Sequence, residues 1–359
     1  MSEKKKAIIA MSGGVDSSVA AYLMQQEGYA CVGATMKLYE NPDIDKENEK
    51  TCGAGEDAKD AEKVAEAFGM PFYLLDFEDE FEQAVIKRFV ETYIAGGTPN
   101  PCIECNRYLK FQKMMQTMYE MDFDYVVTGH YARVEYDEKS GRYLLKKGMD
   151  ESKDQSYVLY NLTQEQLSHT IFPLGKYHKT EIREIAEKMG FVNANKPDSQ
   201  DICFVPDGDY AKFIELYCGK TFPEGDFVTE DGKVLGKHKG IIRYTIGQRK
   251  GLGLALPEPM YVCRKRMEDN AVVLGRNEDL FHRTLEANDL NWIAFPEVTE
   301  PVRCKAKIRY KQKEADAVIE KLSEDRVKVT FDEPQRGITT GQAVVFYDGD
   351  IVLGGGKIC

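Results

Sequence analysis

Long hydrophobic runs are missing from this sequence. No apolar stretch approaches the roughly 18 residues that a membrane-spanning helix requires. The N-terminus is basic at Lys4, Lys5 and Lys6, but the apolar segment behind it is too short for the core of a signal peptide. These absences predict a cytoplasmic protein without a membrane partner.

A surplus of positive charge is also missing. The 48 Lys and Arg residues are outnumbered by 60 Asp and Glu residues, which gives a net charge of −12. This balance argues against non-specific binding of nucleic acid but allows a local basic face. Internal repeats and low-complexity segments are absent as well. A length of 359 residues with 42% hydrophobic content predicts two or three folded domains.

A strong local signal is present at residues 7–18, Ala-Ile-Ile-Ala-Met-Ser-Gly-Gly-Val-Asp-Ser-Ser. The apolar run predicts a buried strand, the two glycines a tight turn, and the apolar spacing after Val15 a helix. The first N–H groups of a helix lack partners within it, and glycines let the backbone approach a ligand. The segment therefore predicts a phosphate loop, to which Ser12 and Ser17 add hydroxyls and Asp16 a ligand for Mg²⁺.

The spacing of this loop separates it from two other phosphate loops. The pattern G-x-x-x-x-G-K-[ST] occurs nowhere in the chain, and no G-x-G-x-x-G follows the strand. Ser-Gly-Gly-Val-Asp-Ser at 12–17 instead resembles the PP-loop of ATP pyrophosphatases, which split ATP between its α and β phosphates and adenylate a substrate. The alternative, a plain turn with incidental glycines, is disfavoured by the strand–turn–helix context.

Strands and helices alternate through the first part of the chain. We expect further strands at 31–38, 72–76 and 124–128, helices at 57–68, 78–94 and 178–189, and a loop at 96–106 leading into a helix that ends near 120. This order predicts an α/β fold with a parallel sheet and helices on both faces. Ligands of such sheets bind beyond the C-terminal strand ends, where the phosphate loop, Met36 and Gly129-His130 all fall.

The pattern changes at Gly219 to short alternating strands separated by turns such as Asp231-Gly232. We expect a catalytic domain at 1–218, a small β-rich middle domain at 219–280 and a C-terminal β-barrel domain at 281–359.

One strand of the expected barrel is unusually basic. Between Val302 and Lys311 cations alternate with apolar residues; the cations are Arg303, Lys305, Lys307, Arg309 and Lys311. Because side chains alternate across a strand, the cations share one face and the apolar residues face a core. An edge strand protected by lysines is one explanation. A surface for a phosphate backbone is the other, and a second basic cluster at Arg243, Arg249 and Lys250 favours it.

Nine cysteines in a cytoplasmic chain are not expected to build a disulfide framework. Cys102, Cys105 and Cys203 stand apart because they lie in polar, irregular sequence. The spacing Cys102-x-x-Cys105 is typical of redox or metal sites. Cys105 also leads into a helix, whose dipole lowers the pKa of a thiol.

Six motifs together resemble the tRNA-specific 2-thiouridylases of the MnmA/TrmU type, a family of the PP-loop, HUP-like superfamily, over essentially the whole chain. They are Ser-Gly-Gly-Val-Asp-Ser at 12–17, Thr-Pro-Asn-Pro…Cys-Asn at 98–106, Gly-His-Tyr-Ala-Arg at 129–133, Lys-Asp-Gln-Ser at 153–156, Ser-Gln-Asp-Ile-Cys-Phe at 199–204, and Thr-Ile-Gly-Gln-Arg-Lys-Gly-Leu-Gly at 245–253.

The resemblance implies a role for each matching position. ATP would bind along Ala10, Met11, Ser12, Gly13, Gly14, Val15, Asp16 and Ser17, with further contacts at Met36 and Gly129. The target base would lie against Asn100, Pro101 and Cys102. Other tRNA contacts would come from His130, Lys153, Asp154, Gln155, Arg309, Tyr310 and Gln342, and the middle domain would also bind tRNA. Cys203 matches the cysteine that carries a persulfide, and Cys105 the second catalytic cysteine.

The sequence departs from the family at one position. Many members have Asp, thought to act as a base, where this chain has Cys102. The change leaves three cysteines, Cys102, Cys105 and Cys203, that could hold a 4Fe–4S cluster with an open position for a labile sulfur. Plain persulfide chemistry is the alternative, and the sequence leaves both open.

The reaction implied by the resemblance is ATP-dependent 2-thiolation of the wobble uridine, U34, in the anticodon stem-loop of tRNA. The base leaves the stack, its C2 oxygen attacks the α-phosphate of ATP with Mg²⁺ present, and sulfur from Cys203 replaces AMP. The sulfur donor is expected to be a protein fed by a cysteine desulfurase. Two alternatives are another PP-loop synthetase and a non-catalytic protein that binds metal or nucleic acid. ATP-dependent pyrophosphate release with tRNA would distinguish the three.

Overall fold

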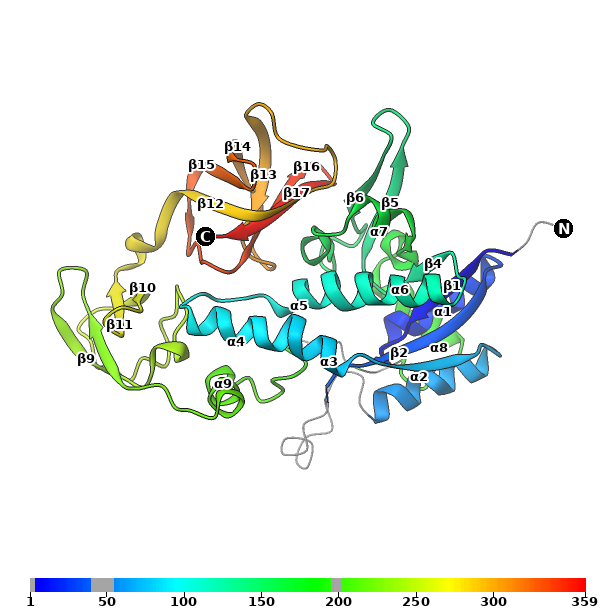
Figure 1. Cartoon of the computed structure of the whole chain (residues 1–359), viewed down its shortest axis with the longest axis horizontal. Coiled ribbons are helices and arrows are strands. Elements are labelled where there is room, and N and C mark those ends of the chain that lie inside the picture. Colours follow the sequence, from blue (N-terminus) through cyan, green and yellow to red (C-terminus); the bar gives the residue numbers. More distant parts are fainter. Residues whose placement is uncertain (1–3, 40–54, 195, 197–201) are drawn as a thin grey trace.

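The computed structural model describes residues 4–39, 55–194, 196 and 202–359. Figure 1 shows an α/β part at one end, a small β-sheet at the other, and a β-barrel above the helices that join them. These parts contain a five-stranded, a four-stranded and an eight-stranded sheet. Within the described ranges, no helix is long and apolar enough to cross a bilayer.

The α/β part is built on a parallel sheet with strand order β3-β2-β1-β4-β7. The strands are β1 Lys6–Ala10, β2 Ala30–Lys37, β3 Phe72–Asp76, β4 Tyr125–Val127 and β7 Thr170–Ile171. Neighbouring residues of β1 point to opposite faces, so Ile9 packs with one set of helices and Ile8 with another. The expectation of a parallel sheet covered on both faces is confirmed.

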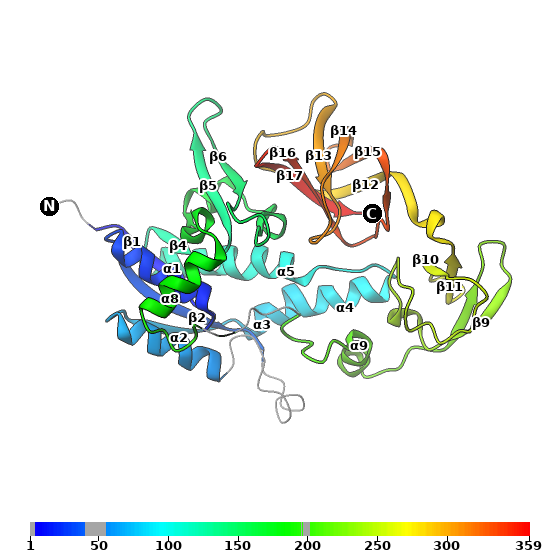
Figure 2. The same cartoon turned by 180° about the vertical axis from the view of Figure 1, so that it is seen from behind.

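Three helices cover one face of this sheet (Figure 2): α1 Val15–Gln26, α2 Glu56–Ala67 and α8 Lys179–Lys188. The other face is covered by α6 Met114–Glu120, through Met114, Met115 and Met118. Shorter helical segments complete this part: α7 Gln164–Ser168, η3 Ser156–Leu159 and η4 Pro173–Lys176. The layers hold the C-terminal ends of β1, β2 and β4 together at one edge.

The helix expected to follow a loop at 96–106 begins earlier than predicted. It starts with α5 Pro101–Glu104, continues as the π-helical η2 Cys105–Lys113, and ends in α6. Asn100 caps it, because its Oδ1 accepts a hydrogen bond from the Cys102 N–H at 3.2 Å, and proline suits the first helical position. Cys102 and Cys105 therefore lie in the first turns of a helix and not in a loop.

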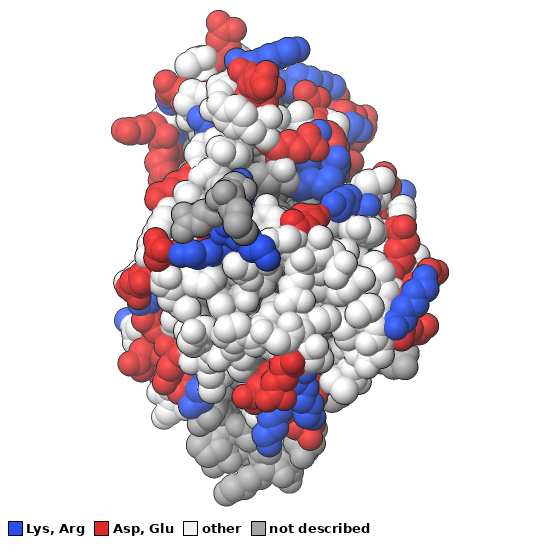
Figure 3. All heavy atoms as spheres, turned by 90° about the vertical axis from the view of Figure 1, so that its right-hand side faces the viewer, with Lys and Arg blue, Asp and Glu red and all other residues white. Residues whose placement is uncertain are grey.

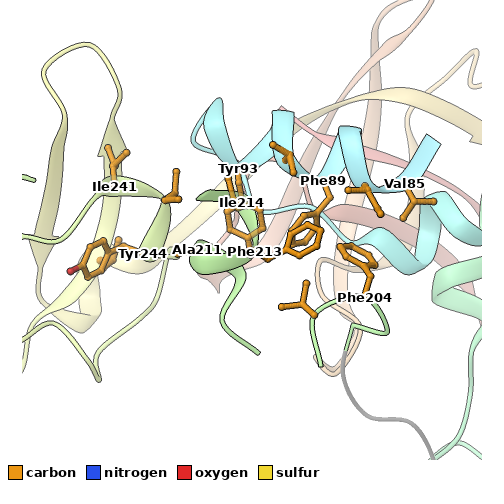
Figure 4. Close-up of a cluster of buried hydrophobic side chains, with 14 of the residues drawn as sticks. Val85, Phe89, Tyr93, Phe204, Ala211, Phe213, Ile214, Ile241 and Tyr244 are labelled. Atoms are coloured by element: carbon orange, nitrogen blue, oxygen red, sulfur yellow. The ribbon is translucent and has the colours of Figure 1, made fainter. Parts of the chain in front are cut away.

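The helix expected at 78–94 is present as α3 Glu78–Phe81, the π-helical η1 Glu82–Ile86 and α4 Lys87–Ile94. Its inner face joins one apolar core with α9 Tyr210–Cys218 and the small β-sheet. Figure 4 shows Phe89 next to Phe204 in this core; the two rings pack edge to face, with centroids 5.2 Å apart. The α/β part and the middle sheet are thus packed on a common core.

The middle sheet has strand order β10-β11-β8-β9. Its strands are β8 Gly225–Val228, β9 Val234–His238, β10 Tyr261–Arg266 and β11 Ala271–Gly275, with short helical turns η5 Ile241–Arg243 and η6 Asn277–Leu280. The barrel follows with β12 Phe281–Trp292, β13 Val302–Lys307, β14 Ala315–Ser323, β15 Arg326–Arg336, β16 Ala343–Asp348 and β17 Ile351–Ile358. Because β12 pairs with both β15 and β17, these six strands close on themselves.

A hairpin of β5 Ala132–Asp137 and β6 Arg142–Lys147 follows β4. It is not a detached feature of the α/β part, because Lys146 of β6 pairs with Ile351 of β17. The barrel sheet therefore continues into the hairpin that follows β4 of the α/β part.

Candidate active site

The loop between β1 and α1 is held in place by contacts that require glycine at one position and a side-chain hydroxyl at another. Gly13 has φ +71°, and a Cβ on it would lie 2.3 Å from the Asp57 carbonyl oxygen, so any side chain would be excluded. The Ser17 hydroxyl donates to the Gly14 carbonyl at 3.0 Å and accepts from the Ser12 N–H at 3.2 Å. The loop is thereby held in one shape at the start of α1.

The end of β4 reaches the same helix start. A Cβ on Gly129 would lie 2.9 Å from the Asp16 carbonyl carbon and 2.9 Å from the Ser17 nitrogen, so this close approach requires glycine. Met36 lies near the C-terminal end of β2, the strand next to β1. In the strand order β2-β1-β4, the C-terminal ends of these three parallel strands are neighbours. This order therefore accounts for the prediction that the phosphate loop, Met36 and Gly129 lie at the same edge of the sheet.

The Asp16 carboxylate is held by two residues that the sequence reasoning missed. The Lys179 ammonium lies 2.8 and 2.7 Å from its two oxygens, and the Tyr131 hydroxyl donates to Oδ1 at 2.7 Å. Both partners are buried. The sequence contained one indication of the role of Lys179. This residue occupies the first position of α8, where a cation is unfavourable because it lies at the positive end of the helix dipole, so a lysine there indicates a compensating partner.

Asn193 is a third missed residue. Its side-chain amide donates to the Gly13 carbonyl and to the Ser18 hydroxyl, both at 2.9 Å, and the side chain is buried. No local spacing connects Asn193 with the loop, because 180 residues separate it from Gly13.

The phosphate loop fits Mg²⁺ as a partner of bound phosphates. Across the described ranges, no group of three His, Cys, Asp or Glu side chains is arranged to hold a metal. Mg²⁺ commonly takes one or two carboxylates and completes its shell with substrate oxygens, and Asp16 is suitably placed for that role.

The three cysteines Cys102, Cys105 and Cys203 are not brought together as metal ligands either. They are not among any group of three metal-binding side chains in the described ranges, so they do not form the ligand set that a 4Fe–4S cluster needs.

The start of α5 forms a second site with residues from the barrel. The Gln342 side chain donates to the carbonyls of Thr98 and Pro99, at 2.8 and 3.3 Å, just before Asn100 and Pro101. Lys265 of the middle sheet donates to the Gly97 carbonyl at 3.4 Å, and burial lowers its pKa to about 8. The segment before Cys102 is thus held from both accessory parts.

Tyr310 brings the barrel next to Cys102. Its hydroxyl donates to the Asp154 carbonyl at 3.2 Å, and Cys102 is exposed beside it. Burial, with smaller effects of Asp154 and Cys102, raises the pKa of Tyr310 to about 12. Among the expected base and tRNA contacts, Asn100, Cys102, Asp154, Tyr310 and Gln342 therefore meet around the start of one helix.

Three other expected tRNA contacts are Gln155, Lys153 and His130. Gln155 exchanges hydrogen bonds with Tyr131, and Lys153 is partly exposed near it in sequence. His130 is 7% exposed; its Nδ1 lies 2.6 Å from the Thr128 hydroxyl. Burial and the charge of Lys110 hold the pKa of His130 well below its usual range, so the ring is neutral at physiological pH. In this conformation His130 presents little surface to a nucleic acid.

Cys105 and Cys203 share one environment although they lie far apart in sequence. Both are part-buried and pack against the same apolar cluster, which contains Phe89 and Phe204. Cys203 directly precedes the fully buried Phe204, so its backbone is anchored on one side. Residues 199–201 of the Ser-Gln-Asp-Ile-Cys-Phe motif lie outside the described residues.

The basic strand differs from both of its predicted explanations. It ends at Lys307, so Arg309 and Lys311 lie beyond it, and β13 is an interior strand between β14 and β16 and not an edge. The alternation holds where the strand exists: Cys304 and Ala306 are buried in the barrel core. The expected row of five cations on one ribbon is therefore wrong.

The cations of this segment have different surroundings. Arg303 forms an ion pair with Asp332, and Lys305 lies 3.9 Å from Asp316. The Lys307 ammonium lies over the ring of Tyr310, 5.7 Å from its centre. Arg309 donates to the carbonyls of Ile246 and Gly337 and to the Thr339 hydroxyl, at 3.2, 2.9 and 2.7 Å. It therefore joins the segment between η5 and β10 to the barrel domain.

The second predicted basic cluster is also divided. Arg243 forms an ion pair with Glu215 at 2.7 Å, whereas Arg249 and Lys250 are exposed. Figure 3 looks onto the α/β end, opposite the middle domain. Cationic and acidic side chains are mixed there around a broad uncharged area, so this face is poorly suited to a polyanion.

Comparison with known proteins gives the same three parts. Residues 5–207 match the tRNA methyl transferase HUP domain, residues 211–276 the tRNA methyl transferase PRC-barrel domain, and residues 282–358 the aminomethyltransferase beta-barrel domain. The chain is 52% identical over 354 residues to the tRNA-specific 2-thiouridylase MnmA of Clostridioides difficile, covering 99% of this chain and 98% of that one. It is 52% identical to the protein of the same name from Acetivibrio thermocellus, covering 99% of both chains.

Proposed function

Because this chain belongs to the family of tRNA-specific 2-thiouridylases, we propose that its phosphate loop activates a tRNA uridine with ATP and that its thiols deliver the sulfur. The protein is a tRNA sulfurtransferase that consumes ATP. Neither another PP-loop synthetase nor a non-catalytic binding protein is favoured. The observation that carries the proposal is the pairing of a built phosphate loop with a cysteine-bearing helix whose start is held by the barrel.

We propose that ATP binds along residues 10–17, with Met36 and Gly129 beside it. The N–H groups at the start of α1 favour phosphate oxygens, and Lys179 provides a buried positive charge next to Asp16. Mg²⁺ held by Asp16 and the phosphates would neutralise charge that develops on them. Asn193 and Ser17 keep the loop in the shape that this contact requires.

The target base is proposed to enter the site at the start of α5. A base must leave the stack before an enzyme can reach its C2 position, and the wobble uridine is the one that the family resemblance implies. Asn100, Pro101 and Cys102 would line the pocket, with Tyr310 and Gln342 at its barrel side. Lys153, Asp154, Gln155 and Arg309 would contact the surrounding tRNA, while His130 would act mainly by supporting the site from within.

The sulfur chemistry is proposed to be persulfide transfer and not cluster chemistry. The uridine C2 oxygen attacks the α-phosphorus and pyrophosphate leaves. The terminal sulfur of a Cys203 persulfide then forms a bond to C2, and AMP leaves with the oxygen. The Cys105 thiolate attacks the inner sulfur of Cys203, which frees the thiouridine and forms a Cys105–Cys203 disulfide. An external dithiol must reduce this disulfide, and a donor protein must supply the next persulfide.

We propose a division into a catalytic domain at 1–218, a middle domain at 219–280 and a barrel at 281–359, the last two binding tRNA. The chemistry requires ATP, tRNA and a sulfur donor fed by a cysteine desulfurase, all of which meet in the cytoplasm. Incubating the protein with unmodified tRNA, ATP and a persulfide donor tests the proposal. Nucleoside mass spectrometry should show 2-thiouridine at position 34, and its formation without ATP would contradict the proposal.

The exposed cations of the middle domain should govern the salt dependence of tRNA binding. Replacing Arg249 and Lys250 with Gln should weaken binding and lower the slope of log K against log salt by about one unit per lost phosphate contact. Arg303→Gln is the matched control, because its charge is already paired with Asp332. A titration in which the double variant keeps the wild-type slope would remove these residues from the tRNA surface.

A further inference from the structure

One segment, residues 148–155, connects the proposed tRNA contacts with the phosphate loop. The Gln155 N–H donates to the Tyr131 carbonyl at 2.9 Å, and the Tyr131 N–H donates to Gln155 Oε1 at 3.0 Å. Gly148 lies against the same residue, because a Cβ on it would be 2.9 Å from the Tyr131 carbonyl oxygen. The backbone of Tyr131 is therefore set by this segment.

The side chain of Tyr131 extends from there to the phosphate loop. It is 2% exposed, and its hydroxyl donates to Asp16 Oδ1 at 2.7 Å. The Lys179 ammonium, which also binds Asp16, lies 5.7 Å from the centre of the Tyr131 ring. A hydrogen bond to a charged acceptor is stronger than one between neutral groups, so the hydroxyl contributes to where the carboxylate sits.

The same segment holds the other partner of Asp16. Asp150 is buried, and its Oδ2 accepts a hydrogen bond from the Lys179 backbone N–H at 3.0 Å. Its Oδ1 accepts from the N–H and the hydroxyl of Ser152, at 3.0 and 2.6 Å. Both groups that fix the Asp16 carboxylate are thus bonded to residues within five positions of Gln155.

We propose that Tyr131 is a positioning residue that couples contact of tRNA with Gln155 to the placement of Asp16, so that pyrophosphate release depends on bound tRNA. The inference rests on the proposed function and assigns a role to a residue outside its reacting groups. A shift of the Gln155 amide moves the Tyr131 backbone, and a buried, close-packed ring transmits that shift to its hydroxyl. The uridine is the nucleophile in any case; the coupling makes its adenylation fast only when the tRNA is also seated against Gln155.

The first test removes only the hydroxyl. Tyr131→Phe keeps the buried ring and should lower kcat for tRNA-dependent pyrophosphate release about tenfold or more, while the Kd for tRNA stays within about twofold. Tyr119→Phe is the control, because its hydroxyl bonds Glu165 on the surface, and it should behave as wild type. Asp150→Asn is a second test variant, because it changes the acceptor of the Lys179 N–H. It should also lower kcat while the Kd for tRNA stays nearly unchanged.

A double-mutant cycle tests the coupling itself. Gln155→Ala should lower kcat at saturating tRNA, and adding Tyr131→Phe should lower it no more than about twofold further, because both act through one connection. The coupling would be overturned if the two substitutions lowered kcat by independent, multiplying factors, or if folded Tyr131→Phe kept the wild-type kcat. Neither result would affect the proposed function, provided that the wild-type protein is active. A wild-type chain that releases no pyrophosphate with ATP and tRNA would instead overturn both.

Discussion

Asp16→Ala is expected to lower pyrophosphate release by about two to three orders of magnitude or more while tRNA binding stays nearly unchanged. The Asp16 carboxylate is held by Lys179 and Tyr131 at the start of α1, where phosphate charge must be stabilised. The proposed tRNA contacts lie on other segments, so no direct contact with tRNA is lost with this side chain. Malachite-green detection after pyrophosphatase treatment, together with filter binding of labelled tRNA, measures both quantities.

Asp122→Ala is the matched control for that variant. Asp122 also forms an ion pair with a lysine, Lys6, at 2.7 Å, but its side chain is 93% exposed and lies away from the phosphate loop. Thermal unfolding should be recorded for both variants, because removing Asp16 takes a partner from a buried ammonium. Wild-type pyrophosphate release by a folded Asp16→Ala protein would refute the assignment of the ATP site.

Cys203→Ala and Cys105→Ala are each expected to abolish formation of 2-thiouridine while retaining tRNA-dependent pyrophosphate release. The phosphate loop activates the base, and the two thiols of the shared apolar cluster only carry sulfur. Cys359→Ser changes an exposed cysteine at the chain end and should leave both activities unchanged. Full thiolation by Cys203→Ala would contradict any route through this residue.

Cys102→Ser then distinguishes the two sulfur chemistries. Persulfide transfer requires no thiolate at this exposed position, so the variant should keep partial activity in air with a persulfide donor. If a cluster operated, the variant would lose iron and activity together, since one ligand would be gone. Iron analysis of anaerobically purified wild-type and variant protein accompanies the assay.

The sequence was sufficient to predict what depends on short-range pattern. The strand–turn–helix at 7–18, the parallel sheet and the approach of Gly129 to the phosphate loop follow from apolar spacing and glycine positions, and the structure has them. The early start of α5 could also have been predicted, because Asn100-Pro101 is a good cap followed by a good first residue. Reading the segment as loop gave too little weight to that capping signal.

What the sequence could not reveal depends on contacts between distant segments. Lys179 and Asn193 reach the phosphate loop only because α8 and the segment after it pack beside α1. The prediction of a basic strand at 302–311 was wrong for a related reason. Alternation of residue types indicates which face of a strand a side chain occupies. It indicates neither the residue at which strand pairing ends nor which acidic side chains lie next to the cations. Asp332 and Asp316 come from β15 and from β14, which the pattern of β13 does not encode.

The fate of one oxygen atom tests the central claim most directly. An anticodon stem-loop with ¹⁸O at C2 of the wobble uridine is incubated with the wild-type protein, ATP and a persulfide donor, and AMP is analysed by mass spectrometry. If the uridine oxygen attacks the α-phosphorus, AMP should carry one ¹⁸O for each 2-thiouridine formed. Unlabelled AMP, or ADP and phosphate in its place, would contradict activation of the base by adenylation.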